Sequence, residues 1–234
     1  MKPQLSQIQR CVVSVSALIC LLCPAMGDDK PGPGEELNLG PPTTPRPAAS
    51  VIVLRGNGAT LEVLLVKRNP NARFMGGAWV FPGGAIGPGD GEGEPAQRAA
   101  GARELAEEAG LEADPESLVP FSRWITPEQV TIRYDTYFFL HRADTAAEPQ
   151  VDGGEVVDHG WFTPEAALTA RREGRILLVF PTIKHLEQLS GFPTVDALLD
   201  HARGQEVRPV QPKVVRWGET ERIVLPGDPG YEQA

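Results

Sequence analysis

The nine residues that decide the fold are Arg103-Glu104-Leu105-Ala106-Glu107-Glu108-Ala109-Gly110-Leu111. They end a Pro-free run, residues 96–109, that is rich in Ala, Glu, Arg and Leu and that meets Gly110, so we expect one helix with a glycine C-cap. Glu104, Glu107 and Glu108 stand at i, i+3 and i+4, so this helix would project three carboxylates from one face. The opposite stripe, which would face the core, consists of Ala102, Leu105, Ala106 and Ala109.

Three carboxylates on one helix face are unfavourable unless something binds them. Like charges at i, i+4 cost roughly 0.2–0.5 kcal/mol, and acidic side chains in the last turn oppose the helix dipole by roughly 0.3–1 kcal/mol each. A hard divalent cation removes this penalty, and oxygen ligands at this density suit Mg²⁺ or Mn²⁺. A solvated acidic helix is the alternative interpretation.

The residues before the helix carry a resemblance to a known family. Phe81-Pro82-Gly83-Gly84 is typical of a strand end and a turn whose glycines let the backbone approach a ligand closely. The pattern Arg-Glu-apolar-x-Glu-Glu-x-Gly-apolar, preceded by Pro-Gly-Gly, resembles the signature of the Nudix hydrolases. This resemblance implies an α/β fold, the Nudix α/β/α sandwich, here with extra C-terminal helices. It also implies Mg²⁺- or Mn²⁺-dependent cleavage of a diphosphate, with Glu104, Glu107 and Glu108 as metal ligands and Arg103 bracing the acidic cluster.

One part of the signature departs from the family pattern. Eighteen residues separate Gly84 from Arg103, five more than the family pattern has, and the excess falls in a loop insertion at residues 87–95. The first glutamate of the family pattern is replaced by Pro95 in register. Glu94 and Glu92 are the candidates to take over its role.

A second pattern narrows the substrate. Leu64 to Asn69, followed at fixed spacing by Arg73, Gly77 and the Phe81 to Gly84 turn, resembles the motif of coenzyme A diphosphatases, with Val66 and Asn69 as departures. Residues 122–127 and 225–231 resemble the acyl-CoA diphosphatase branch. The resemblance implies substrate binding by Arg68, Arg73, Gly77, Gly83 and Gly84. Guanidinium groups are the best side-chain partners for phosphate oxygens, so we expect Arg68 and Arg73 to contact the phosphates of CoA.

The implied reaction is attack of a metal-activated water on the diphosphate, which releases 3′,5′-ADP and 4′-phosphopantetheine or its acyl form. Glu155 is our candidate for the general base, with Glu108 second. Phe180 and Phe192 are candidates for an acyl-binding groove. Two alternatives stay open: a Nudix pyrophosphatase acting on ADP-ribose, a nucleoside-diphosphate sugar or a dinucleotide, and a non-catalytic nucleotide-binding Nudix module.

The remaining pattern divides the chain into four parts. We expect a signal peptide or a spurious N-terminal extension at 1–27, a Pro/Gly-rich linker at 28–49, a Nudix domain at 50–207 and an irregular C-terminal extension at 208–234. Within the domain, strands are expected at 50–55, 61–67, 131–141 and 155–162. Helices should follow Thr163 and the two Phe-Pro-Thr triplets at 180–182 and 192–194.

Composition excludes several classes of function. The 234 residues are 41% hydrophobic and 23% charged with a net charge of −9, and no basic block is present, so nucleic-acid binding through a basic patch is excluded. Cys11, Cys20 and Cys23 all precede the linker, so a thiolate nucleophile in the domain is excluded as well. We expect no membrane-spanning segment in the mature domain, and a homodimer is an assembly to test. The expected location is the cytoplasm, with export as the alternative if residues 1–27 act as a signal peptide.

Overall fold

The computed structural model describes residues 38, 40–56, 60–217 and 220–233. The expected signal peptide, half of the expected linker (28–37 and 39) and the three cysteines lie outside the described residues. The strands are β1 (Arg46–Arg55), β2 (Glu62–Arg68), β3 (Ala78–Val80), β4 (Gly83–Ala85), β5 (Val119–Ile125), β6 (Tyr134–Arg142), β7 (Val156–Phe162), β8 (Leu177–Leu178), β9 (Pro209–Val210), β10 (Lys213–Trp217) and β11 (Thr220–Val224). The helices are α2 (Gly93–Ala109), α3 (Pro164–Arg172), α4 (Phe180–Leu189) and α5 (Val195–Arg203), with short 3-10 turns η1 (Pro88–Asp90), η2 (Pro115–Ser117) and η3 (Tyr231–Gln233).

Strand β1 is the centre of a mixed nine-stranded sheet of order β8-β3-β2-β1-β6-β5-β9, with β4 paired to β1 and β7 paired to β2. It runs parallel to β6 and antiparallel to β2 and β4. Its apolar run is buried on both faces of the sheet, which is why the sequence there is continuously hydrophobic rather than alternating.

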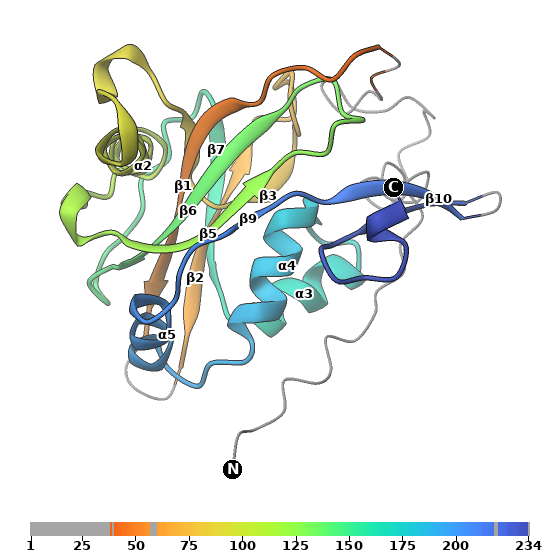
Figure 1. Cartoon of the computed structure of the whole chain (residues 1–234). Helices are drawn as coiled ribbons and strands as arrows, with labels where there is room; N and C mark the ends of the chain where they lie inside the picture. The colour runs from red at the N-terminus through yellow and green to blue at the C-terminus, as the bar shows by residue number, and fades with distance from the viewer. Residues whose placement is uncertain (1–37, 39, 57–59, 218–219, 234) are drawn as a thin grey trace.

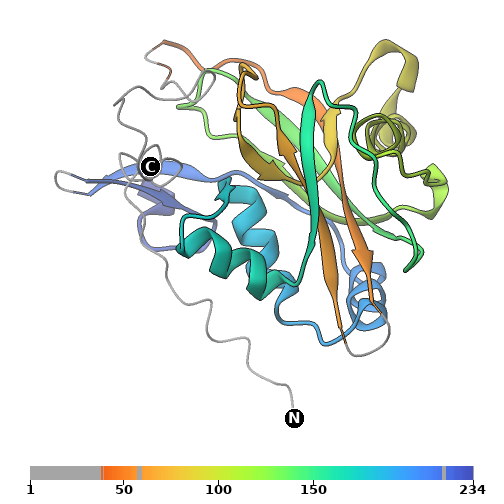
Figure 2. The ribbon, with the colours of Figure 1, turned by 180° about the vertical axis from the view of Figure 1, so that it is seen from behind.

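Helices cover both faces of this sheet (Figures 1 and 2). On one face, Val51 and Val53 of β1 pack with Leu105 and Ala109 of α2. On the other, the β1 residues of opposite parity belong to a second core cluster, which α3, α4 and α5 complete: Ile52 and Leu54 with Ala167, Leu186 and Leu198. The expected α/β/α sandwich with extra C-terminal helices is therefore confirmed.

Local signals explain where the helices begin and end. Gly110 ends α2 in the left-handed conformation, at φ 64°, and its N–H donates to the carbonyl of Ala106. The hydroxyl of Thr163 caps α3 by accepting from the N–H of Ala166, and Thr194 caps α5 in the same way. These helices were expected from the sequence, and α2 begins at Gly93, three residues before the expected start.

Two expected boundaries are wrong. The first strand begins at Arg46 rather than Ser50, because Arg46 and the residues after it pair with β6 and Ala48 and Ala49 are buried. The part after residue 207 is not an irregular extension. Its residues 209–210 form β9, an edge strand that pairs with β5, and β10 and β11 form an antiparallel hairpin. The Pro-rich composition of this segment argued against strands, but proline is tolerated in edge strands.

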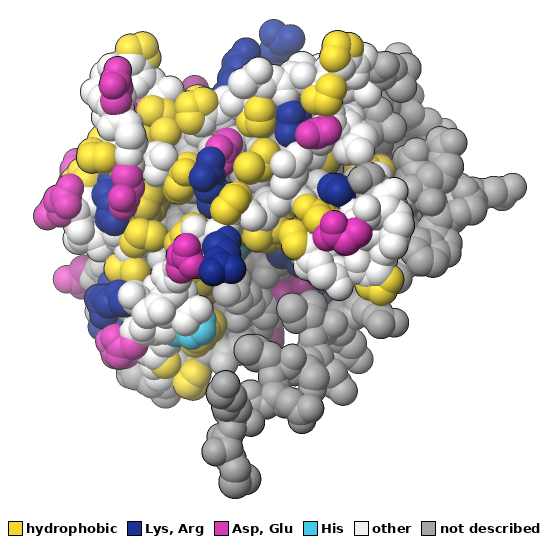
Figure 3. Space-filling model, viewed as in Figure 1, with side chains coloured by type: hydrophobic (Ala, Val, Ile, Leu, Met, Phe, Trp, Pro, Cys, Tyr) yellow, Lys and Arg dark blue, Asp and Glu magenta, His cyan; other side chains and the backbone are white. Residues whose placement is uncertain are grey.

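The surface, like the sequence, shows no concentrated block of basic side chains among the described residues on the face in view (Figure 3). On the face shown in Figure 3, basic and acidic side chains are interspersed rather than gathered by sign. Within the described ranges, no helix has the length and apolar character that a membrane crossing requires.

Candidate active site

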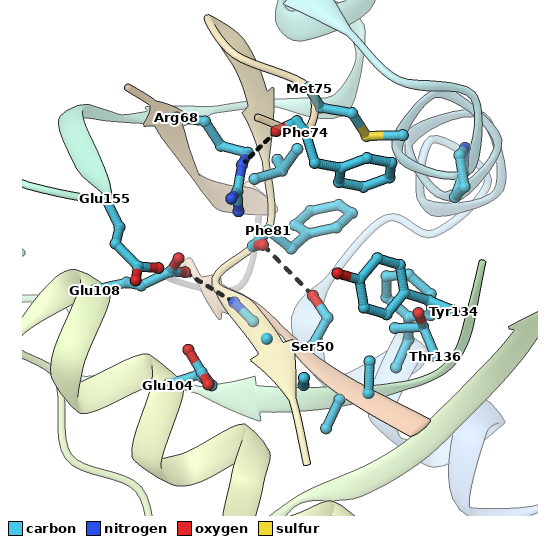
Figure 4. A pocket seen from close by; sticks show the side chains of 18 of the residues that line it. Ser50, Arg68, Phe74, Met75, Phe81, Glu104, Glu108, Tyr134, Thr136 and Glu155 are labelled. Atoms are coloured by element: carbon cyan, nitrogen blue, oxygen red, sulfur yellow. Dashed lines mark hydrogen bonds between the residues drawn. The ribbon is translucent and has the colours of Figure 1, made fainter. Parts of the chain in front are cut away.

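The three glutamates of α2 face a pocket of about 730 Å³ between α2, the β3–β4 turn and β6. They differ in environment: the Glu108 residue is 3% exposed, whereas the side chains of Glu104 and Glu107 are 12% and 59% exposed. The carboxylate of Glu108 accepts a hydrogen bond from the backbone N–H of Gly83 at 2.9 Å. Figure 4 shows Glu104, Glu108 and Glu155 on one side of this pocket.

Arg103 ties the acidic cluster together. Its Nη1 donates to Glu104 at 2.7 Å and to Glu107 at 3.0 Å, and its Nη2 donates to the carbonyl of Ala85 at 3.2 Å. The same guanidinium holds Asp90 through two bonds, from Nε at 3.0 Å and from Nη2 at 2.9 Å. Arg103 therefore neutralises part of the repulsion among the acids and aligns two of them from the helix side.

Asp90 is a residue that sequence reasoning missed. It ends η1, inside the inserted loop, and its carboxylate also accepts from the N–H of Gly87 at 2.7 Å. Glu94, one of the two residues expected to replace the first signature glutamate, instead pairs with Arg98 one turn along α2. Glu92 is exposed and precedes α2 as its N-cap. The inserted loop thus supplies the acid that contacts Arg103, but from a position the family spacing does not indicate.

Gly83 and Gly84 lie so close to neighbouring atoms that neither position has room for a side chain. A side chain on Gly84 would bring its Cβ to 2.4–2.6 Å from the carboxylate of Glu104. A side chain on Gly83 would lie 2.5 Å from the carbonyl oxygen of Ala49 and 2.6 Å from the Cα of Ser50, both in the backbone of β1. Gly84 therefore makes room for the acidic cluster, while Gly83 lets β4 pack against β1.

Burial changes the protonation of two of the acids. Burial raises the pKa of Glu108 to about 7, against the opposing effects of the Gly83 N–H and Arg68. Burial also raises the pKa of Glu104, and Arg103 opposes this shift. The charge of Glu155 raises the pKa of both, so the carboxylates repel one another across the pocket. Such mutual repulsion favours a bound cation.

The carboxylates fit a hard divalent cation. Glu104, Glu107 and Glu108 each use one carboxylate oxygen in a hydrogen bond and keep the other clear of described partners. In the described part of the chain, no group of three or more Asp, Glu, His or Cys side chains is already placed to hold a metal ion by itself. Mg²⁺ is rarely bound by protein side chains alone, because it keeps several waters and takes one or two carboxylates plus substrate phosphates.

Two segments that are hydrogen-bonded to each other, the end of β2 and the loop before β7, bring Arg68 and Glu155 to the pocket. A register shift between Lys67 and Arg68 in the β2–β7 ladder bends the strand end, as bulges do beside functional sites. The backbone and side-chain N–H groups of Asn69 donate to the carbonyls of Glu155 and Gly154, both at 2.8 Å. Asp152 in turn accepts from the backbone N–H groups of Gly154, Glu155 and Val156.

The structure does not bring Arg73 and Gly77 to the pocket. Arg73 is exposed in the turn after β2 and is not among the residues that line the pocket. Gly77 has a φ of 78°, and its N–H donates to the carbonyl of Arg68, so it closes the turn that carries Phe74 and Met75. At these two positions, the residues of the CoA diphosphatase motif belong to the turn after β2 rather than to the pocket. Of the two arginines of this motif, only Arg68 lines the pocket.

The other half of the pocket is apolar, and sequence reasoning missed it. It is lined by Phe74, Met75, Phe81, Tyr134, Phe138 and Val179. The expected groove residues are elsewhere: Phe180 packs against Trp124, and Phe192 packs against His201 and the core. A signal in the sequence was the aromatic-Met pair 74–75 inside the turn of the CoA motif, where a solvated loop would carry polar side chains.

Met75 adopts a strained backbone. Its φ is 52°, the one positive value found among the described non-glycine residues. A left-handed conformation costs an L-residue about 1–2 kcal/mol, and such strain is concentrated at ligand sites. The side chain of this strained residue lies at the pocket wall (Figure 4).

The fold and the carboxylate helix define a class of protein, the hydrolases of phosphoric anhydride bonds. A family model described as "NUDIX domain" matches residues 44–180, and the chain therefore belongs to the Nudix family. The chain is 27% identical over 225 residues to "Putative nudix hydrolase 7" of Caenorhabditis elegans, which covers 80% of this chain and 74% of the relative.

Solved structures show the same fold. A NUDIX hydrolase from Alicyclobacillus acidocaldarius is 27% identical, with a TM-score of 0.61 over 68% of this chain and 96% of that chain. The NUDIX domain of Shewanella oneidensis NrtR, solved with ADP ribose, is 18% identical with a TM-score of 0.51 over 64% of this chain and 88% of that chain. At that identity, the second likeness concerns the fold alone.

Proposed function

We propose that this Nudix hydrolase cleaves the diphosphate of CoA or acyl-CoA to 3′,5′-ADP and 4′-phosphopantetheine or its acyl form. The observation that carries the proposal is the position of Arg68 between the carboxylates and the apolar half of the pocket (Figure 4). The Nε of Arg68 donates to the carbonyl of Phe74 at 3.2 Å, and its guanidinium makes no ion pair with a described residue. A substrate with a diphosphate next to a long uncharged group matches this order of surfaces.

The roles of the residues follow from their positions. Mg²⁺ or Mn²⁺ held by Glu104, Glu107 and Glu108 would lower the pKa of the attacking water and neutralise the leaving oxygens. Arg68 binds diphosphate oxygens, since it lines the pocket and its guanidinium forms no ion pair with a described acid. Arg103 keeps the acids in place, because its guanidinium already holds Asp90, Glu104 and Glu107.

We assign the general base to Glu155, with Glu108 second. The carboxylate of Glu155 lies beside that of Glu108 in the pocket, and Glu155 is exposed on a loop that Asp152 and Asn69 hold in place. An exposed carboxylate reaches a water without rearrangement of the helix, whereas Glu108 is buried against Gly83.

The test is a substrate panel with the full chain in Mg²⁺ and in Mn²⁺: CoA, an acyl-CoA, ADP-ribose and a dinucleotide, with products identified by mass spectrometry. We expect 3′,5′-ADP from the CoA compounds and a loss of at least about 100-fold in kcat/KM for Glu107→Gln, since the metal stabilises several kcal/mol of developing charge. Cleavage of ADP-ribose or the dinucleotide in preference to CoA would contradict the substrate. Binding without cleavage of any compound would favour the non-catalytic module.

A further inference from the structure

We infer that the apolar half of the pocket binds the uncharged pantetheine and acyl arm of the substrate and that Met75 sets acyl-chain preference. This inference rests on the proposed function and adds the orientation of the substrate to it. We call the surface formed by Phe74, Met75, Phe81, Tyr134, Phe138 and Val179 the apolar chamber.

Charge separates the two ends of the pocket. All of its charged lining residues come from β2, α2 and the loop before β7: Arg68, Arg103, Glu104, Glu107, Glu108, Asp152 and Glu155. The apolar chamber has no charged residue. The nucleotide end of CoA carries a 3′-phosphate, and burying that charge without a cation is strongly unfavourable. The pantetheine arm carries no charge.

Hydroxyl groups in and beside the chamber suit the amides of this arm. The hydroxyls of Tyr134, Thr136 and Thr182 line the pocket and make no hydrogen bond to any described residue. Thr182 belongs to the first turn of α4 and is 3% exposed. A few hydroxyl groups in an apolar wall can orient an amide-bearing chain, which is the usual construction of a small-molecule pocket.

The aromatic rings do not form a slot for a purine. The rings of Phe74 and Tyr134 contact each other, with centroids 5.5 Å apart and planes tilted by 55°. A base sandwiched between two aromatic rings needs a gap between parallel planes, which two rings in contact do not leave. The pair instead forms one continuous wall, shown at one side of the pocket in Figure 4.

Met75 is the adaptable part of that wall. The unbranched thioether fits ligands of different shape, so it suits chains of varying length. Met75 lies in the turn after β2 with a positive φ of 52°. The residue before it, Phe74, accepts a hydrogen bond from the Nε of Arg68 through its carbonyl. The diphosphate subsite and the chamber are therefore connected through one turn of chain.

The experiment compares Met75→Gly with Met75→Leu, and uses Phe192→Leu as the matched control outside the pocket. It measures kcat/KM for CoA and for acyl-CoAs of increasing chain length, together with inhibition constants for 4′-phosphopantetheine and 3′,5′-ADP. Glycine is free of the strain of a positive φ, so Met75→Gly should melt no lower than the wild type, which separates selectivity from folding damage.

We expect Met75→Gly to change the ratio of long-chain acyl-CoA to CoA turnover by about tenfold, the effect of losing one apolar side-chain contact. The inhibition constant of 4′-phosphopantetheine should rise, and that of 3′,5′-ADP should stay within about twofold. Met75→Leu should restore most of the ratio, and Phe192→Leu should leave it unchanged.

Two results would overturn the inference. One is a selective rise in the inhibition constant of 3′,5′-ADP in Met75→Gly, which would place the nucleotide in the chamber. The other is no change in either inhibition constant or in the turnover ratio. Failure of the proposed function can be told apart from failure of this inference, because in the first case the wild-type protein itself would cleave no CoA compound.

Discussion

At the scale of single residues, the site depends on how closely backbone and carboxylate approach each other. Gly83 and Gly84 are neighbours in one turn, yet a side chain at each would meet a different kind of atom. At Gly84 it would meet the movable end of the Glu104 side chain, and at Gly83 the fixed backbone of β1. The two glycines therefore serve activity and folding separately.

This difference predicts opposite effects of two alanine substitutions. Gly84→Ala displaces the Glu104 carboxylate from Arg103, so we expect kcat to fall at least about tenfold while the free energy of unfolding changes by less than about 1 kcal/mol. Gly83→Ala overpacks β4 against β1 and should destabilise the fold by about 1–3 kcal/mol. Urea unfolding and steady-state kinetics on the same preparations measure both, and a stable, active Gly83→Ala protein would contradict the assignment.

At the scale of elements, the inserted loop completes the carboxylate helix. Residues 87–95 place η1 beside α2, where Asp90 accepts two hydrogen bonds from Arg103. The Arg103 guanidinium holds the pKa of Asp90 below its ordinary value, so this acid stays charged. The loop is thus part of the frame that orients Glu104 and Glu107 through Arg103.

The loop should influence the site through Asp90 and not through Glu94. We expect Asp90→Asn to weaken Mn²⁺ binding and to lower kcat by about 10–100-fold, the usual effect of removing an outer-shell partner. Glu94→Gln removes an exposed acid that pairs with Arg98 and should stay within about twofold of the wild type. Calorimetric Mn²⁺ titration provides a readout independent of turnover. Equal effects of the two variants would sink the assignment.

At the scale of the whole molecule, one buried histidine joins α4 to the sheet beneath the apolar chamber. His185 is 1% exposed, its Nε2 lies 2.6 Å from the hydroxyl oxygen of Ser122, and its ring contacts Phe81 and Phe138 of the chamber wall. Burial lowers the pKa of His185 to about 3. Folding therefore requires the neutral ring, and the stability of the whole domain is linked to pH.

Acid should unfold the protein partly through this residue. Between the ordinary histidine pKa near 6.5 and the folded value near 3, the unfolded chain binds a proton that the folded chain does not. This contribution to stability is complete above pH 6.5 and falls by at most about 1.4 kcal/mol per pH unit below it. In urea unfolding at pH 5, 6 and 7, His185→Gln should show a correspondingly smaller loss, and an identical pH slope would disprove the linkage.

The sequence by itself determined what depends on local spacing. The period of 3.6 residues placed three glutamates on one face of α2, the glycine at 110 marked the end of the helix, and the apolar runs marked β1 and β2. The family signature then indicated the sandwich and the class of reaction. These features need only neighbours along the chain, so no tertiary contact was required to see them.

Only the tertiary structure decided which distant residues meet. It joined Asn69 to Glu155, brought Asp90 of the inserted loop to Arg103, and left Arg73 outside the pocket. It also turned the Pro-rich residues 209–210 into an edge strand and gathered the apolar chamber from a turn, β6 and the start of α4. The physical reason is the same in each case: strand pairing and loop contacts between distant segments set these positions, and sequence spacing carries no record of such contacts.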